Sequence, residues 1–142
     1  FADLARPRSG RLLYLPVEYE SRMPLLLFGA DIMIGRSGGW VAELAAAGVP
    51  SVLVPLPNAP GDHQTGNARA MEVAGAAVML ADADCTGATL EAVLEPLLSD
   101  PERLEAMAAA ARLLGRPGAA GRVADLVEAQ VRPADRKAAV AR

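Results

Sequence analysis

Two short polar stretches contain the residues whose types and spacing could do chemistry. In the first, Ser37, Gly38 and Gly39 follow the predicted buried strand 31–34 almost directly, and Glu43 comes four residues later. Glycines let the backbone approach a ligand closely, and free N–H groups at a helix start attract phosphate. A carboxylate one turn into that helix can accept hydrogen bonds from ribose hydroxyls. The pattern indicates a nucleotide-diphosphate site, and the alternative is an ordinary strand-to-helix connection with a serine N-cap.

The second stretch is a proline-rich loop, 55–61, that runs into polar residues at a predicted helix start. Asp62, His63 and Gln64 are consecutive, and Asn67 lies one helical turn further on. Side chains three or four residues apart share a helix face, and sugars need such a mixture of donors and acceptors. The pattern indicates a site for a hydroxyl-rich ligand. In the alternative interpretation, Asp62 is only an N-cap and Asn67 only a helix-packing residue.

The composition argues against several other kinds of site. His63 is the only histidine and Cys85 the only cysteine, so no metal cluster can be built from these residues, and we predict neither a metal nor a cofactor. A single cysteine forms no internal disulfide, which favours a reducing compartment. The Gly-x-Ser-x-Gly motif of a serine hydrolase is absent from the sequence.

Charge and hydropathy indicate a cytoplasmic protein that does not bind nucleic acid. The 142 residues include 14 basic and 17 acidic side chains, which leave a net charge of −3 instead of a basic excess. We find neither an apolar run long enough for a membrane span nor a secretory signal. We interpret 1–131 as one domain and 132–142 as a solvated polar tail, with contact to anionic lipid as the alternative for the tail.

The elements that must position the polar residues alternate between strand and helix. We predict strands at 11–16, 31–34, 51–54 and 76–80, and helices at 21–30, 41–47, 62–75, 89–98, 101–114 and 119–131. This order predicts an α/β fold with a Rossmann-like, doubly wound parallel sheet. Ligands bind such sheets outside the carboxyl ends of the strands, and the loops 17–21, 35–39 and 55–64 all belong there.

Five segments closely resemble the MurG family of N-acetylglucosaminyltransferases. They are RSGG at 36–39, AELAAAGVP at 42–50, VPLP at 54–57, DHQTGNA at 62–68 and AGAA at 74–77. The resemblance covers roughly 12–131. It implies the C-terminal, donor-binding half of a GT-B glycosyltransferase, in which two Rossmann-like domains face each other. Family members transfer N-acetylglucosamine (GlcNAc) from UDP-GlcNAc to undecaprenyl-pyrophosphoryl-muramyl-pentapeptide during peptidoglycan synthesis.

The resemblance also implies a role for each residue of the two stretches. The turn of Ser37, Gly38 and Gly39, with Trp40 beside it, would hold the diphosphate of UDP. Glu43 would hold the ribose hydroxyls, and Glu20 would meet uracil through its backbone. His63 and Gln64 would reach the GlcNAc hydroxyls, while Asn67 would support that loop or touch the sugar.

The resemblance assigns no catalytic residue to this chain. In the family, the N-terminal half carries the acceptor site and the proposed base, and no metal is required. We therefore expect the chain alone to be inactive. Together with an N-terminal domain or subunit, we expect it to act on a lipid-linked acceptor in the cytoplasm, with the inner face of the cell membrane as the possible location. The family's C-terminal domain also has further strand–helix units before the strand at 11–16. Without them the sheet would expose an edge.

One departure from the family pattern leaves the orientation of Glu43 open. The segment between Gly39 and Val41 is one residue short, and the loss of one residue rotates all later side chains of a helix by about 100°. The shortened spacing resembles that of non-hydrolysing UDP-GlcNAc 2-epimerases, which lack the DHQ…NA run. Two further interpretations are the donor half of a two-subunit glycosyltransferase and a non-catalytic binding module or fragment that needs a partner.

Overall fold

The computed structural model describes residues 15–130, whose helices and strands alternate as the sequence predicts. Their order is α1 (Met23–Gly29), β1 (Met33–Gly35), α2 (Val41–Ala47), β2 (Ser51–Leu53), α3 (His63–Val73), β3 (Ala77–Met79), α4 (Gly87–Leu98), α5 (Pro101–Leu114) and α6 (Ala119–Gln130). Single 3-10 turns precede α3 (Pro60–Asp62) and follow β3 (Asp82–Asp84). Most of the predicted strand at 11–16, and the predicted tail at 132–142, lie outside the described residues.

The described strands form one parallel sheet in the order β1-β2-β3. Ser51 of β2 is paired with Met33 of β1 on one side and with Ala77 of β3 on the other. Each strand is followed by a helix, so the predicted α/β class with a parallel sheet is confirmed. Among the described strands, β1 has a neighbour on one side only, and its residue Ile34 is 44% exposed.

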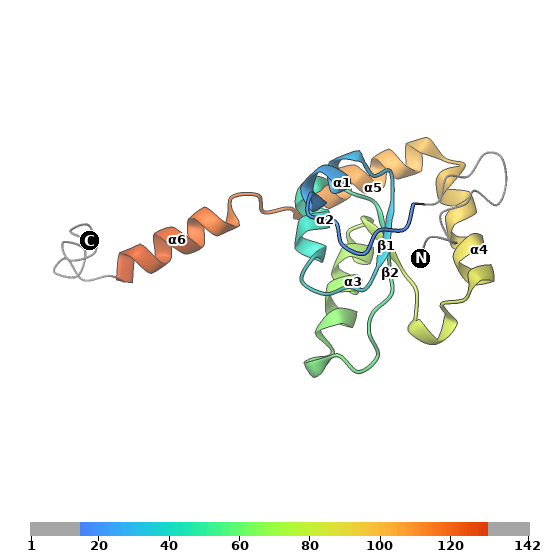
Figure 1. Cartoon of the computed structure of the whole chain (residues 1–142), viewed down its shortest axis with the longest axis horizontal. Helices are drawn as coiled ribbons and strands as arrows, with labels where there is room; N and C mark the ends of the chain where they lie inside the picture. Colours follow the sequence, from blue (N-terminus) through green and yellow to red (C-terminus); the bar gives the residue numbers. More distant parts are fainter. Residues whose placement is uncertain (1–14, 131–142) are drawn as a thin grey trace.

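Two apolar cores lie on opposite faces of this sheet because successive side chains of a strand point in opposite directions. Leu53 belongs to a core with Leu44 of α2, Met71 of α3 and Ala111 of α5. Its neighbour Val52 belongs to the second core, which α4, the start of α5 and the residues after β2 and β3 complete. Figure 1 shows the same layers, with α2 and α3 on one side of the strands and α4 on the other.

Local capping signals determine where most of the helices begin and end. Gly48 ends α2 with φ 73°, a left-handed conformation that favours glycine, and Gly75 after α3 has φ 79°. Asp100 caps α5, since its Oδ1 accepts the Arg103 N–H at 3.0 Å. α4 begins at Gly87, two residues before the predicted start at Thr89. Thr86 is its N-cap and accepts the Thr89 N–H at 3.2 Å.

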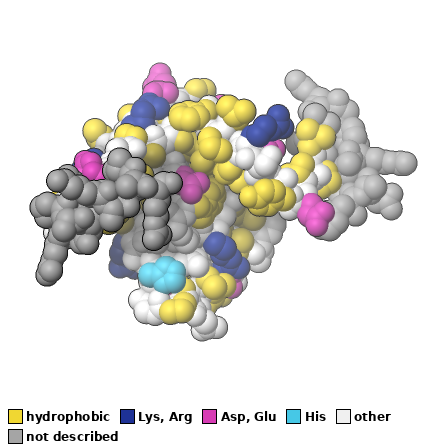
Figure 2. All heavy atoms as spheres, turned by 60° about the vertical axis from the view of Figure 1, so that its left-hand side comes forward, with side chains coloured by type: hydrophobic (Ala, Val, Ile, Leu, Met, Phe, Trp, Pro, Cys, Tyr) yellow, Lys and Arg dark blue, Asp and Glu magenta, His cyan; other side chains and the backbone are white. Residues whose placement is uncertain are grey.

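Exposed apolar side chains occur on α1 and α6, among other helices. Phe28 of α1 is 76% exposed, and α6 extends away from the rest of the described chain without a buried residue (Figure 1). Apolar side chains also lie between charged ones over the face shown in Figure 2. No helix in 15–130 has both the length and the hydropathy needed to cross a membrane.

Candidate functional site

The two polar stretches meet at the carboxyl edge of the sheet. Ser37 follows β1, and its side chain is completely buried. Its Oγ donates to the Gln64 carbonyl oxygen at 2.8 Å, while Asn67 Nδ2 donates to the Ser37 carbonyl oxygen at 2.9 Å. Two hydrogen bonds thus hold the turn after β1 against the first turns of α3. The sequence stretches that we singled out separately therefore form one structure.

The turn between Ser37 and α2 presents unpaired backbone donors. The N–H groups of Gly38, Gly39 and Trp40 form no hydrogen bond within the described chain, although the carbonyls of all three accept from the first residues of α2. A Cβ added at Gly38 or Gly39 would meet no atom within 4 Å. Packing in the free protein therefore does not require these glycines. The arrangement leaves room and donors for an anionic ligand.

Trp40 packs back onto the end of β1. Its indole N–H donates to the Arg36 carbonyl oxygen, and its ring covers Gly35. A Cβ on Gly35 would lie only 2.6 Å from Trp40 Cζ2, so a larger residue there would displace the ring. The indole ring thus covers the end of β1, next to the turn.

Glu43 is exposed in the first turn of α2, and its side chain has no hydrogen bond or ion pair within 15–130. A hollow beside it runs between α2 and α3 and is lined by Gly38, Gly39, Asn67 and apolar residues, but not by Glu43. The carboxylate is therefore free for a ligand, and its role in ribose binding stays a prediction.

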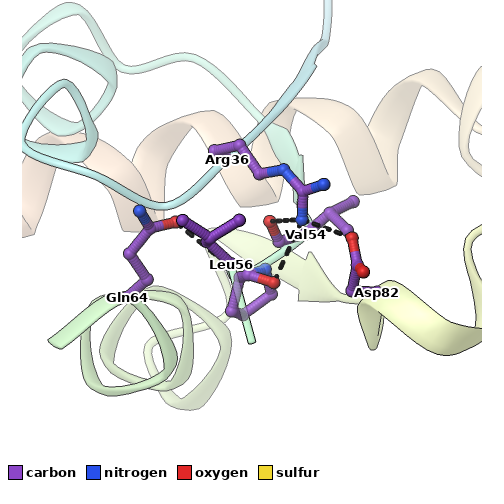
Figure 3. A network of polar contacts seen from close by, with 6 residues as sticks. Arg36, Val54, Leu56, Gln64 and Asp82 are labelled. Atoms are coloured by element: carbon purple, nitrogen blue, oxygen red, sulfur yellow. Dashed lines mark hydrogen bonds and ion pairs between the residues drawn. The ribbon is translucent and has the colours of Figure 1, made fainter. Parts of the chain in front are cut away.

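The proline loop is held in shape by the polar residues that come after it. Gln64 Oε1 accepts the Leu56 N–H at 3.0 Å, and the nitrogen of the same amide points away from Leu56 in Figure 3. His63 is exposed, with Nδ1 2.7 Å from the Pro60 carbonyl oxygen. Because a carbonyl only accepts, Nδ1 donates this hydrogen bond, and in the neutral imidazole Nε2 can then accept from a ligand hydroxyl. Each side chain thus keeps one polar atom for a ligand.

Asp62 is the N-cap of α3 by position but not by hydrogen bonding. It has φ 52°, in the left-handed region, and its side chain forms no cap hydrogen bond. Left-handed backbone is uncommon for a residue other than glycine, and aspartate tolerates it better than most. The Asp62 side chain therefore does not cap α3, and the alternative interpretation of Asp62 as only an N-cap is wrong.

Glu20 lies before α1, apart from this network. Its Oε1 accepts the backbone N–H of Arg22 at 2.6 Å and lies 3.3 Å from the Arg22 Nε. The backbone hydrogen bond from Arg22, helped by the guanidinium charge, lowers the pKa of this carboxyl. Within 15–130, Glu20 forms hydrogen bonds to Arg22 alone, so the structure does not join it to the turn or to α3.

Sequence reasoning missed two residues at this edge, Arg36 and Asp82. Arg36 Nη1 donates to the carbonyl oxygens of Val54 and Pro55 and lies 2.5 Å from Asp82 Oδ1 (Figure 3). A signal was available. Arg36 is the first residue of the RSGG motif, and Asp82 comes shortly after the last predicted strand. In a parallel sheet the residues that follow the strands lie at the same edge, so Asp82 could have been expected near Arg36.

Residues 15–130 contain no group of three or more His, Cys, Asp or Glu side chains that could hold a metal ion. Figure 3 shows a network of hydrogen bonds and one ion pair around the strand ends. Such a site can bind and orient a polar ligand by hydrogen bonding.

Comparison with known proteins shows what this chain is similar to. Residues 6–127 match the family described as the glycosyltransferase family 28 C-terminal domain. One similar relative is the UDP-N-acetylglucosamine–N-acetylmuramyl-(pentapeptide) pyrophosphoryl-undecaprenol N-acetylglucosamine transferase of Gluconobacter oxydans. It is 51% identical over 115 residues, which are 80% of this chain and 32% of the relative. The transferase of the same name from Solibacter usitatus is 48% identical over 118 residues, 82% of this chain and 32% of that protein.

Solved structures are similar to this chain as well. The crystal structure of Acinetobacter baumannii MurG matches with a TM-score of 0.73 and 35% identity, over 80% of this chain and 34% of that one. A glycotransferase of kitacinnamycin matches with a TM-score of 0.57 and 30% identity, over 78% of this chain and 28% of that one. The chain thus spans about a third of the length of the relatives that it matches.

Proposed function

Because the chain belongs to the glycosyltransferase family 28 C-terminal domains, we propose that it is the donor-binding half of an N-acetylglucosaminyltransferase and binds UDP-GlcNAc. The observation that carries the proposal is the pair of hydrogen bonds that joins Ser37 to Gln64 and Asn67. These bonds hold a turn whose N–H groups are unpaired within 15–130 next to the polar side chains at the start of α3. A nucleotide sugar carries its diphosphate next to its sugar hydroxyls, so it would need both features side by side.

The diphosphate would bind at the turn of Ser37, Gly38 and Gly39. Its oxygens would accept from the N–H groups of Gly38, Gly39 and Trp40, which are unpaired within 15–130, and the absence of a Cβ at the two glycines leaves room. Backbone donors are held rigidly by the strand before and the helix after them. This preorganisation lowers the free energy lost on ordering the site.

The sugar would bind at the start of α3. His63 Nε2 can accept from one GlcNAc hydroxyl, and the Gln64 amide nitrogen can donate to another, because their other polar atoms are already bonded. In this proposal Asn67 supports the site, because its amide is bonded to the Ser37 carbonyl. Hydrogen bonds to a rigid loop favour one arrangement of hydroxyls over its epimers.

The nucleoside would extend toward α2 and the segment before α1. The Glu43 carboxylate, exposed and unbonded among the described residues, would accept from both ribose hydroxyls. The backbone near Glu20 would meet uracil. α2 begins at Val41, and Glu43 is the only acidic residue in its first turn.

The complete reaction would need a second half. The matched relatives are about three times as long as the matched region, and their printed names describe transfer to a pyrophosphoryl-undecaprenol acceptor. We propose that an N-terminal domain or subunit binds such a lipid-linked acceptor and supplies the base. The assembled enzyme would then work at the cytoplasmic face of the membrane, where the acceptor lipid is anchored.

Calorimetric titration of the 142-residue chain and its Gly39→Ala variant with UDP tests the site. The added methyl group meets no protein atom in the free chain, so the thermal midpoint should not fall. If phosphate approaches the backbone there, UDP affinity should drop by about tenfold or more, which corresponds to the loss of one or two hydrogen bonds to a charged group. Gly121→Ala, in the exposed helix α6, is the matched control. Absence of UDP binding by the unmodified chain would overturn the proposed function.

A further inference from the structure

Arg36 links the ends of all three described strands. It directly follows β1, and Figure 3 shows its guanidinium reaching across the carboxyl edge of the sheet. Nη1 donates to the carbonyl oxygens of Val54 at 3.4 Å and Pro55 at 3.2 Å, both just after β2. The same nitrogen lies 2.5 Å from Oδ1 of Asp82, after β3. We call this arrangement the Arg36–Asp82 brace.

The brace differs from an ordinary surface ion pair. Exposed ion pairs alone contribute little to stability, and both side chains here are partly exposed. Arg36, however, also bonds carbonyls of two buried residues. The guanidinium therefore fixes the backbone of 54–55 as well as pairing with Asp82, and Asp82 holds the guanidinium in that orientation.

The brace is connected to both parts of the candidate site. Arg36 precedes Ser37 in the diphosphate turn, and its own carbonyl accepts the indole N–H of Trp40. Pro55 precedes Leu56, whose N–H donates to the Gln64 side chain at 3.0 Å. A shift of 54–56 relative to Arg36 would therefore move the Gln64 amide relative to the turn.

We propose that Arg36 and Asp82 are positioning residues, which set the distance between the diphosphate turn and the sugar-binding loop. The inference rests on the proposed function of the site. UDP contacts only the turn and its surroundings, whereas UDP-GlcNAc must span the turn and the loop together. The brace therefore contributes to the affinity for the whole nucleotide sugar more than to the affinity for UDP.

The test compares UDP-GlcNAc with UDP on the 142-residue chain and on the Asp82→Asn variant. The substitution keeps the shape of the side chain but removes its charge. UDP-GlcNAc affinity should fall about three- to fivefold, as expected for a partly exposed ion pair, while UDP affinity changes less than about twofold. Calorimetry gives both affinities, and the fluorescence of Trp40, the only tryptophan, gives an independent reading at the turn.

A second variant and a double variant separate positioning from general stability. Arg36→Met should lower the ratio of UDP-GlcNAc to UDP affinity further, because it also removes the two carbonyl bonds. Arg36→Met combined with Asp82→Asn should lower that ratio by less than the product of the single effects, since both remove one interaction. A merely structural role would lower the thermal midpoint and leave the ratio unchanged. Should Arg36→Met fail to fold, Asp82→Asn decides the outcome alone.

Glu105→Gln is the matched control. Glu105 Oε1 pairs with Arg112 Nη2 at 2.8 Å, in a hollow that Asp31 and Pro50 also line, before β1 and β2. Loss of that charge at the amino edge should leave both affinities unchanged. If Asp82→Asn weakens both ligands equally or neither, the positioning inference is overturned while the proposed function stands. If the unmodified chain binds neither ligand, the proposed function and this inference fall together.

Discussion

Two completely buried serines show what single hydroxyl groups do in this fold. Both Ser37 and Ser51 have an exposed fraction of 0%. Ser37 Oγ donates to the Gln64 carbonyl oxygen at 2.8 Å, whereas Ser51 Oγ has no hydrogen-bond partner in the described structure. Burial without a partner costs free energy, so only the Ser37 hydroxyl should stabilise the fold.

Alanine substitutions should separate the two hydroxyls. Ser37→Ala should lower the free energy of unfolding by about 0.5–1.5 kcal/mol, the usual net contribution of an intramolecular hydrogen bond. Ser51→Ala should leave that free energy unchanged or raise it, because it removes a buried polar group that lacks a partner. Urea denaturation measures both. An equal loss in the two variants would contradict this prediction, because the bonded and the unbonded hydroxyl would then contribute alike.

Glu43 carries the ribose prediction. If its carboxylate accepts both ribose hydroxyls, Glu43→Ala should weaken UDP binding by about 1.5–3 kcal/mol, and stability should change little because the side chain is exposed and unbonded in 15–130. A deoxyribose form of UDP should bind the unmodified chain less well, yet bind the variant about as well as UDP does. Calorimetry measures all four affinities.

The control for that experiment is Glu91→Ala, which removes an exposed carboxylate from α4 on the other face of the sheet. It should leave UDP affinity unchanged. Equal affinities of UDP for the Glu43→Ala variant and the unmodified chain would contradict the ribose role. The shortened turn would then have rotated the carboxylate out of the site.

At the scale of elements, local sequence signals predicted most of the fold. Apolar runs placed the three described strands, and Gly48 and the Asp100 cap placed helix ends, because these signals depend on neighbours in the chain. The start of α4 was misplaced because Thr86 and Thr89 are both plausible caps. Their hydroxyls in fact bond to each other at 2.8 Å.

Contacts between elements were harder to predict. The sequence indicated that the loops after β1 and β2 share one edge, but not that Asn67 bonds the Ser37 carbonyl or that Arg36 reaches Asp82. Nor did it indicate that the Trp40 ring covers Gly35. Such contacts depend on side-chain direction and on strand order, which local patterns do not contain.

The C-cap of α2 provides a prediction at this scale. Gly48→Ala should destabilise the chain by about 1–2 kcal/mol, because Gly48 has φ 73° and an added Cβ would lie 2.5 Å from Arg112 Cγ. Gly121→Ala, inside α6 and with no atom within 4 Å of the added Cβ, should be neutral or stabilising. Thermal denaturation distinguishes the two. A Gly48→Ala variant as stable as the unmodified chain would show that the left-handed cap contributes nothing.

At the scale of the whole molecule, the chain corresponds to about a third of the transferases that it resembles. It includes the strand ends and helix starts that form the candidate donor site. Exposed apolar side chains on α1 and α6, such as Phe28 and Leu126, are consistent with the proposed need for another half. Donor binding and sugar transfer should therefore be separable properties.

The 142-residue chain by itself should show no transferase activity. The proposed site holds the donor only, and the acceptor site and the base would belong to the other half. Incubation of the purified chain with labelled UDP-GlcNAc and a lipid-linked acceptor measures this. Steady formation of glycosylated lipid would contradict the proposal that the acceptor site and the base belong to the other half. A family member of full length serves as the positive control.

The measurement that tests the central claim most directly is calorimetric titration of the chain with UDP and with ADP. The two ligands share the diphosphate and ribose, so the turn and Glu43 would contact both, and only the base differs. A site built for UDP-GlcNAc should bind UDP measurably more tightly than ADP, because backbone groups near Glu20 would recognise uracil. Equal affinities would contradict a uridine-nucleotide site.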